Sequence, residues 1–225
     1  SGSKFMVPDA AQATWIAVVG SDAAGGAVVA LVAGSDVTAQ AQASHALIDL
    51  TKRASTLDFT GVKAQRVLSG DKVASAIRDY LLIGALLTAA EAVGSTSACL
   101  AGIVDYLKTR KQFGKLIGSF QALKHPTVDI YVGMEHSRSL VYHASSEIDD
   151  GPLSTEAEVA CRMAKAKASD TIQYAGDRSV QFHGGFGFTW ECDSSLFIRR
   201  AAWSQQQFGD AMHHRKRLAP LLLDA

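Results

Sequence analysis

Apolar and polar residues alternate at short range in the first third of the chain. Up to about Leu68, short apolar runs are separated by Gly, Asp and Ser, a pattern typical of strands joined by turns. The clearest runs are Trp15–Val19, Val28–Val32 and Ser55–Phe59. The Gly25–Gly26 pair between the first two runs predicts a hairpin turn. This part of the chain is therefore predicted to form a small β domain.

Two further segments of this region carry predictions. Leu50–Phe59 is predicted to form a pair of strand segments with polar outer faces. Gly2–Val7 already has the pattern of a strand, although the sequence does not begin with Met. We therefore expect that a region N-terminal to residue 1 is missing, and that the chain starts within its β domain.

From Asp71 the apolar spacing becomes helical and stays so almost to the C-terminus. Ser69–Asp71 is a typical helix start, which divides the chain into residues 1–69 and 70–225. The short Gly114–Gly118 connection predicts that the first two helices are antiparallel neighbours in a bundle. Pro126 is expected to kink the second helix near its first turns. The predicted helices span residues 71–110, 117–149, 154–182, 193–203 and 204–223.

The ends and faces of these helices carry further signals. Asp149–Pro152 ends the second helix. Ser154 and Thr155 cap the third helix, and Glu158 is placed to close a capping box on Thr155. Helices of this length with Ala-rich faces can bury more area than one bundle needs. We therefore expect the chain to form oligomers through helix faces.

Composition and charge exclude several classes of protein. The chain has 225 residues, of which 48% are hydrophobic, enough for a full core. Its 22 Lys and Arg balance 22 Asp and Glu, so no nucleic-acid partner is expected. Cys99, Cys161 and Cys192 are widely spaced and odd in number, which argues against disulfides and a zinc site and favours a cytoplasmic location. Tyr80–Leu107 is apolar, but Glu91 interrupts it, so we expect a buried bundle helix rather than a membrane span.

Two motifs at the ends of predicted helices suggest a site for a phosphate-bearing cofactor. Arg110–Gly114 places a permanent cation, an amide and an aromatic ring at a helix terminus, a set suited to a pyrophosphate and an adenosine. In Gln181–Gly187, Gly184 and Gly185 lack a Cβ, so the backbone can approach a flat ligand closely. Both glycines also suit a helix C-cap and turn.

Together these motifs resemble the acyl-CoA dehydrogenase family. Ile117–Gln121 follows the first motif and Phe188–Glu191 follows the second, as in the family, and Arg199–Arg200 sits on the expected helix. The resemblance implies an α+β, mainly α fold. Residues 1–69 would be part of the family's middle domain, a partial β-barrel or sandwich, and residues 70–225 its C-terminal up-down four-helix bundle. The family's N-terminal helical domain has no counterpart here.

The resemblance also implies a cofactor and partners. Family members use the two motifs to hold the FAD of the neighbouring subunit, which implies a dimer with a flavin at its interface. They remove two hydrogens from an acyl-CoA thioester, and an electron-transfer flavoprotein is the expected electron acceptor. Lipid β-oxidation, of fatty acids or of steroid side chains, is the implied context. The cofactor-binding residues implied are Arg110, Gln112, Phe113, Gln121, Gln181, Gly184 and Gly185.

The glutamate base of the family is not found at its usual positions. Alignment on the motifs places one known position of that base at Phe208 and the other at Gly84, and neither residue can accept a proton. The segment that contacts the flavin of its own subunit corresponds to Met6–Pro8. Asp210 and Met212 replace the Thr and Gln that help to hold it. These losses predict no catalytic residue here, and favour a non-catalytic subunit that lends half of an FAD site to a catalytic partner, as in actinobacterial heteromeric enzymes.

Two alternatives stay open at the level of sequence. The chain could be a self-sufficient homomeric acyl-CoA dehydrogenase whose base is unrecognised, with Asp79, Glu91 or Glu191 as the candidates. It could also be a flavin-free helical interaction module. His183 is assigned no chemistry, and His213–Arg217 is predicted to be a solvated basic face rather than a metal or phosphate site.

Overall fold

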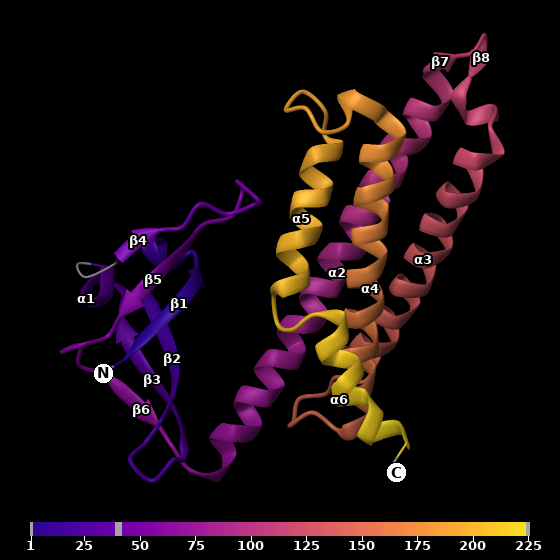
Figure 1. The fold of residues 1–225 in the computed structure, drawn as a ribbon. Coiled ribbons are helices and arrows are strands. Elements are labelled where there is room, and N and C mark those ends of the chain that lie inside the picture. Colours follow the sequence, from indigo (N-terminus) through magenta and orange to yellow (C-terminus); the bar gives the residue numbers. More distant parts are fainter. Residues whose placement is uncertain (1, 39–41, 224–225) are drawn as a thin grey trace. The chain divides into compact units, whose positions relative to one another are not determined.

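The computed structural model describes residues 2–38 and 42–223 and divides the chain into two compact units, Ser1–Asp79 and Tyr80–Ala225 (Figure 1). Strands dominate the first unit and long helices the second. The predicted α+β, mainly helical fold class is confirmed. The division at Asp79 lies within the first long helix, later than the predicted boundary between residues 69 and 70. The assignment of residues 1–69 to the family's middle domain stays a prediction.

The first unit contains two antiparallel sheets, with strand orders β1-β5-β4 and β2-β3-β6. Strands β2 and β3 form the predicted hairpin, with Ser21 opposite Ala27. Its turn is fixed by Asp22, whose Oδ1 accepts hydrogen bonds from the backbone of Ala24 and Gly26. The elements are β1 Ser3–Pro8, η1 Ala10–Gln12, β2 Trp15–Ser21, β3 Ala27–Ala33, α1 Gly34–Thr38, β4 Gln42–Ser44, β5 Ala54–Asp58 and β6 Arg66–Leu68.

Side chains from both sheets meet in the core of this unit, among them Ile16 of β2, Val32 of β3 and Leu57 of β5. This shared core agrees with the predicted partial barrel or sandwich. The prediction of paired strand segments over residues 50–59 is wrong in its first half, because only Ala54–Asp58 is a strand. The backbone N–H and the hydroxyl of Thr51 both donate to Asp49 Oδ1, at 2.9 and 2.7 Å. These local hydrogen bonds favour a turn at this point over the pairing of residues 50–53 with a neighbouring strand.

The second unit contains most of the first long helix and all later elements. They are α2 Asp71–Thr109, β7 Lys111–Gln112, β8 Lys115–Leu116, η2 Ile117–Ser119, α3 Gln121–Ser146, α4 Thr155–His183, η3 Gly184–Phe186, α5 Ser194–Gln206 and α6 Ala211–Leu223. The second helix starts at Gln121, not at residue 117, because the β7–β8 hairpin and η2 come first. The last helix starts at Ala211, not at residue 204, because Phe208 and Gly209 adopt positive φ angles of 56° and 95°.

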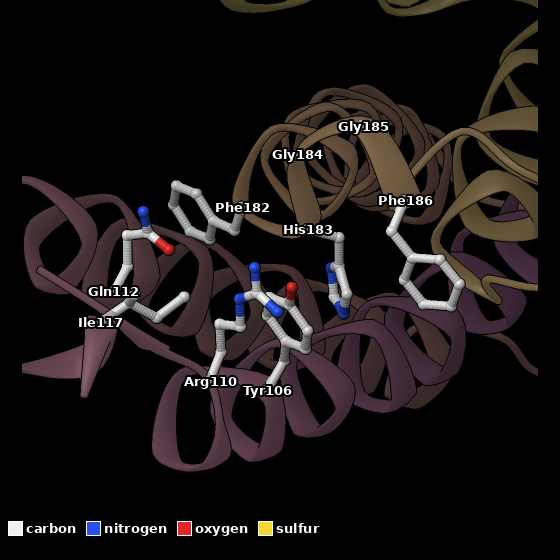
Figure 2. A pocket seen from close by; sticks show the side chains of 9 residues that line it. All are labelled: Tyr106, Arg110, Gln112, Ile117, Phe182, His183, Gly184, Gly185 and Phe186. Carbon is white, nitrogen blue, oxygen red and sulfur yellow. The ribbon is translucent and has the colours of Figure 1, made fainter. Parts of the chain in front are cut away.

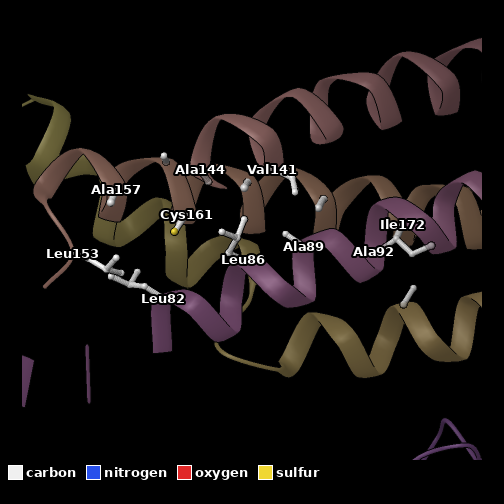
Figure 3. Packing of buried hydrophobic residues seen from close by; sticks show 14 residues of the cluster. Leu82, Leu86, Ala89, Ala92, Val141, Ala144, Leu153, Ala157, Cys161 and Ile172 are labelled. Atoms are coloured by element: carbon white, nitrogen blue, oxygen red, sulfur yellow. The ribbon is translucent and has the colours of Figure 1, made fainter. Parts of the chain in front are cut away.

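Helix α4 is central to the helical unit. Buried residues of α2, α3, α4 and α5 form one continuous cluster along it, drawn in Figure 3. Most members on α4 are alanines, which allow helix axes to approach closely. At Gly176 the backbone of α5 is so near that an added Cβ would lie 2.9 Å from Cα of Ile198. A second cluster, built on Ile103, Ile130 and Phe182, continues the core toward the β7–β8 end.

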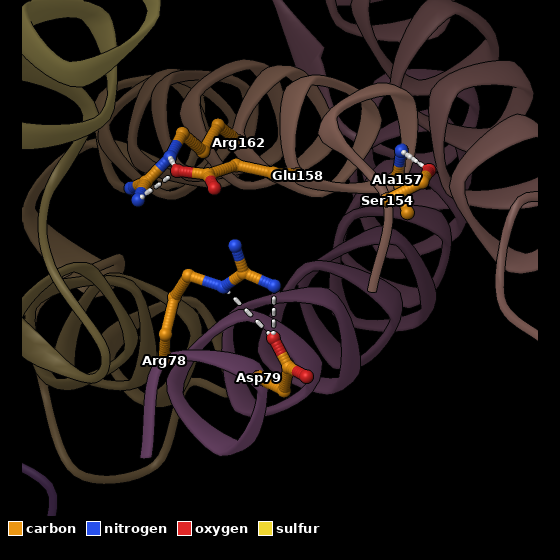
Figure 4. Close-up of polar contacts among 6 residues, drawn as sticks. All are labelled: Arg78, Asp79, Ser154, Ala157, Glu158 and Arg162. Carbon is orange, nitrogen blue, oxygen red and sulfur yellow. Dashed lines mark hydrogen bonds and ion pairs between the residues drawn. The ribbon is translucent and has the colours of Figure 1, made fainter. Parts of the chain in front are cut away.

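The start of α4 corrects the predicted capping box. Ser154 is the N-cap, and its hydroxyl accepts a hydrogen bond of 3.0 Å from the backbone N–H of Ala157 (Figure 4). Thr155 is already the first helical residue, so it cannot serve as the cap of a box with Glu158. The Glu158 carboxylate instead accepts from Arg162, one turn further along the helix, at 2.8 Å.

Helix α2 is long and apolar enough, by length and composition, to cross a membrane, a test that the buried core helix of a protein also passes. Leu82, Leu86 and Ala89 on this helix lie in the α4-centred cluster, and Ile103 and Leu107 lie in the second one. These contacts agree with the predicted bundle helix.

Candidate functional site

The two sequence motifs meet in one pocket of about 680 Å³. Figure 2 shows Tyr106 extending from α2, Arg110 from the residue that follows α2, Gln112 from the β7–β8 hairpin, and Phe182 and His183 from the end of α4. The lining residues are Tyr106, Arg110, Gln112, Ile117, Phe182, His183, Gly184, Gly185 and Phe186. The fold therefore brings Arg110, Gln112, Gly184 and Gly185, four of the seven predicted cofactor residues, to one place.

Arg110 is held by its backbone, while its side chain is left for a ligand. Its N–H donates to Tyr106 O and its carbonyl accepts from Ile117 N, both at 2.9 Å, which ties the end of α2 to the far side of the hairpin. Within residues 2–38 and 42–223, no carboxylate pairs with its guanidinium, and none lines the pocket. The site therefore offers one unneutralised cation, which suits an anionic ligand.

The end of α4 exposes backbone to the pocket. Gly184 is the C-cap, with a φ of 62° and a ψ of −143°, and its N–H donates to Gln181 O. A Cβ added at Gly184 or Gly185 would meet no atom within 4 Å, so this surface is open to a ligand. Gly187 has the opposite role, since an added Cβ would lie 3.0 Å from Cα of Val180. Here a side chain would disrupt the turn.

His183 has a defined place that the sequence did not reveal. Its ring stacks on that of Tyr106, with centroids 4.1 Å apart and planes 28° apart. Its Nδ1 lies 2.8 Å from Ser179 O and 3.0 Å from Ser194 Oγ. A carbonyl can only accept, so Nδ1 is the donor in this contact. The two rings provide an aromatic wall of the pocket. The one sign of this in the sequence was the position of Tyr106, one helical turn before Arg110, which places both side chains on the same side of the chain.

Three predicted cofactor residues lie outside the pocket lining. Phe113, at the hairpin tip, is 82% exposed, has a φ of 54° and meets the ring of Phe120 edge-on at 6.3 Å. Gln121 is the first residue of α3, and Gln181 lies in the last turn of α4; both are exposed. Their cofactor roles stay predictions.

Gly84 and Phe208, far apart in sequence, are in contact within the helical unit. The Phe208 ring rests on α2, where a Cβ added to Gly84 would lie 2.6 Å from Phe208 Cζ and 2.5 Å from Cδ1. The ring of Tyr80, one turn earlier on α2, meets Phe208 edge-on with centroids 6.0 Å apart. There is no room for a second side chain at this point.

Two buried basic groups surround the loop that carries Phe208. Lys165 of α4 is fully buried, and its Nζ donates to Ser169 Oγ at 2.9 Å and to Ser204 O at 3.1 Å. His214 of α6 is 2% exposed, and its Nε2 donates to Phe208 O at 3.0 Å. Burial lowers the pKa of Lys165 to about 8, partly opposed by Asp210. Burial, reinforced by the charge of Lys165, lowers the pKa of His214 to about 4.

Comparison with known proteins identifies the family. The sequence profile described as "Acyl-CoA dehydrogenase, C-terminal domain" matches residues 74–220. The chain belongs to the acyl-CoA dehydrogenase family. It is 39% identical over 134 residues to "Acyl-CoA dehydrogenase IpdE2" of Mycolicibacterium smegmatis, a match that covers 60% of this chain and 40% of the relative.

Solved structures of the family share the fold of nearly the whole chain. The glutaryl-CoA dehydrogenase–glutaryl-CoA complex aligns with a TM-score of 0.91 and 25% identity, over 99% of this chain and 58% of that one. A chain of the ChsE4-ChsE5 complex from Mycobacterium tuberculosis aligns with a TM-score of 0.87 and 23% identity, over 100% of this chain and 60% of that one. The present chain thus spans less than two thirds of each relative.

The pocket between the two motifs fits the FAD on which acyl-CoA dehydrogenases depend. Arg110 supplies an unneutralised cation for a diphosphate, and the open backbone at Gly184 and Gly185 suits close approach by a flat group. Tyr106 and His183 add an aromatic wall. The fit rests on these residues, and the predicted roles of individual side chains are untested.

The candidate acids for a replacement base have other contacts. Asp79 Oδ1 accepts two hydrogen bonds from Arg78, at 2.9 and 2.7 Å (Figure 4). Glu91 forms an ion pair with Arg200. Glu191 lines a separate cavity of about 260 Å³ that also contains Cys99 and Cys192.

Two other predictions about side chains have different outcomes. The predicted basic face at the start of α6 is wrong for His214, which points into the core, while its other members, His213 and Arg215–Arg217, are exposed. Asp210, which stands where the family has a Thr that helps to hold the flavin, accepts from the backbone N–H of His213 at 2.7 Å and so caps α6.

Met6–Pro8 lies on β1 in the first unit. Met6 has a positive φ of 57°, and the register between β1 and β5 shifts between Lys4 and Val7. The segment lines a largely apolar pocket of about 300 Å³ within that unit. Pro8 can provide neither a hydroxyl nor a backbone donor there.

Proposed function

We propose that this chain is a subunit of an FAD-dependent acyl-CoA dehydrogenase complex and lends half of an FAD site to a catalytic partner subunit. The observation that carries the proposal is the joining of Arg110, Gln112, Gly184 and Gly185 in one pocket. The contact between Gly84 and Phe208 complements it, because both positions predicted for a base are occupied without a carboxylate.

The residues of this chain would act by binding and orientation. Arg110 would neutralise a phosphate of the cofactor, and Gln112 would provide an amide beside it. The backbone at Gly184 and Gly185 would lie against the cofactor at close range, with the Tyr106–His183 stack as a neighbouring wall. FAD, when bound, accepts the hydride removed from the β carbon of an acyl-CoA thioester. The partner would supply the base that takes the α proton.

The likeness to IpdE2 supports the assignment to an acyl-CoA dehydrogenase, and the ChsE4-ChsE5 complex is an example of this fold in an assembly of different chains. We propose acyl-CoA thioesters as substrates of the complex, in fatty acid or steroid side-chain oxidation, an electron-transfer flavoprotein as its electron acceptor, and the cytoplasm as its location. The self-sufficient homomeric enzyme is the second candidate, because it needs the same pocket and differs only in where the base lies.

The test is flavin retention by the full-length protein purified with its partner subunit. Arg110→Gln is expected to lower FAD affinity at least tenfold, because a charge-assisted contact to phosphate contributes about 1.5–3 kcal/mol. Lys111→Gln is the matched control: this neighbouring cation lies outside the pocket lining and should leave affinity unchanged. Affinity is measured by the quenching of flavin fluorescence on binding.

Equal affinity of the two variants would contradict the role of Arg110. Full flavin content and turnover in the chain purified without any partner would favour the homomeric enzyme. No flavin under any pairing would favour the flavin-free interaction module.

A further inference from the structure

Phe208 is placed where the family's reaction needs open space. Its ring covers Gly84 on α2 so closely that even a methyl group at residue 84 would overlap it. Tyr80 borders the ring on the same helix. Under the alignment that underlies the proposed function, residues 84 and 208 are the two positions from which a base reaches the α carbon of the substrate. While this ring is in place, residue 84 has no room for any side chain, a carboxylate included.

The loop that carries Phe208 is held from two sides. Phe208 and Gly209 follow α5 in succession with φ angles of 56° and 95°, and the first of these is unfavourable for a bulky side chain. His214 donates to the carbonyl of Phe208 itself. Lys165 donates to the carbonyl of Ser204, in the last turn before the loop. Since both donors are buried, water competes poorly for these bonds, and they fix the loop.

Resting on the proposed function, we propose that Phe208 is a plug that closes the acyl site of this chain, and that Lys165 and His214 are the positioning residues that hold it there. A pair formed with a catalytic subunit would then bind one acyl-CoA rather than two. The chain's contribution to the complex is confined to the FAD pocket at the other end of α2 and α4.

The contact itself is tested by thermal unfolding of the full-length protein. Gly94 is a matched control on α2, because an added Cβ there meets no atom within 4 Å. Gly94→Ala should raise the unfolding temperature slightly, since Ala favours helix more than Gly. Gly84→Ala alone should lower the unfolding temperature or leave it unchanged. In a protein that also carries Phe208→Ala, Gly84→Ala should raise the unfolding temperature as Gly94→Ala does. Equal effects of Gly84→Ala with and without Phe208 would overturn the plug.

The function of the plug is tested with octanoyl-CoA as the probe. Equilibrium dialysis of the full-length protein should show that Phe208→Ala binds one more thioester per chain than the unmodified protein. Phe197→Ala, which truncates an aromatic residue of α5 in the other core cluster, should show no gain. No gain in Phe208→Ala would overturn the proposal, as would an equal gain in both variants.

Flavin content of the same samples separates the two ideas. A gained thioester site in a protein that never retains FAD would leave the plug standing and defeat the half-site function. Retained FAD that depends on Arg110, without any gained site, would leave the half-site function standing and defeat the plug.

Discussion

The buried side chains of Lys165 and His214 hold the Phe208 loop rigidly, but burying their charged forms costs free energy. Among the described residues, the donors that Lys165 and His214 present are met by carbonyl and hydroxyl oxygens, and His214 Nδ1 has no partner. A buried imidazole is more stable neutral than charged, which is why its pKa falls. Such an arrangement makes the stability of the helical unit depend on pH.

His214 should make the fold sensitive to acid. The unfolded imidazole takes up a proton below the ordinary histidine pKa of 6.5, whereas the folded one does so only near a pKa of about 4. The unfolded state therefore binds more protons in this window, and the free energy of unfolding falls as pH drops from 6.5 to 4, by about 3 kcal/mol from this group. Urea unfolding at a series of pH values measures it. His214→Gln should flatten the slope, and His213→Gln, an exposed neighbour, should not; a wild-type slope in His214→Gln would refute the assignment.

At the scale of elements, local signals were sufficient for most of the helices and strands. The start of α2 at Asp71 and the β2–β3 hairpin follow from spacing and turn residues alone. Ser154 and Thr155 were both predicted as caps of α4, and only the capping box on Thr155 was wrong, because the backbone geometry makes Ser154 the cap.

Ser154 should contribute more to stability than Thr155. Ser154→Ala removes the acceptor of the Ala157 N–H and is expected to cost about 1 kcal/mol of unfolding free energy. Thr155→Ala changes an exposed residue in the first turn and should cost less than about 0.5 kcal/mol. Chemical denaturation of both variants gives the comparison. Equal losses of unfolding free energy in the two variants would mean that Ser154 is not the N-cap of α4.

The site shows where sequence patterns end. Arg110 and Gly184 could be predicted because each motif is contiguous and needs its residue types for a local reason, a free cation or a missing Cβ. The Tyr106–His183 stack and the Gly84–Phe208 contact join distant segments, and no local spacing encodes them. The left-handed backbone conformation of Phe208 is one that a bulky residue rarely adopts. The hydrogen bond from His214 to its carbonyl holds it there.

For the whole molecule, the two ends of the helical unit differ in what they offer. The end formed by α2, the hairpin and α4 keeps an open pocket with an unneutralised arginine. The region around Gly84 is closed by the ring of Phe208, and neither of these two residues carries a carboxylate. Under the proposed function, an assembly of this chain alone would have the motif pocket for the FAD of the neighbouring copy, while Gly84 and Phe208 would provide no proton acceptor.

This asymmetry predicts the flavin stoichiometry. The full-length protein produced alone should retain little FAD, and co-production with a homologous catalytic subunit should give about one FAD per pair of chains, read from visible absorption and protein concentration. The physical reason is that this chain contacts FAD from one side only, so it binds FAD weakly until the second subunit provides the remaining contacts. Arg110→Gln in the co-produced pair should lose that FAD, while Phe208→Ala, which lies in the closed region, should keep it. One FAD per chain in the protein produced alone would refute the half-site.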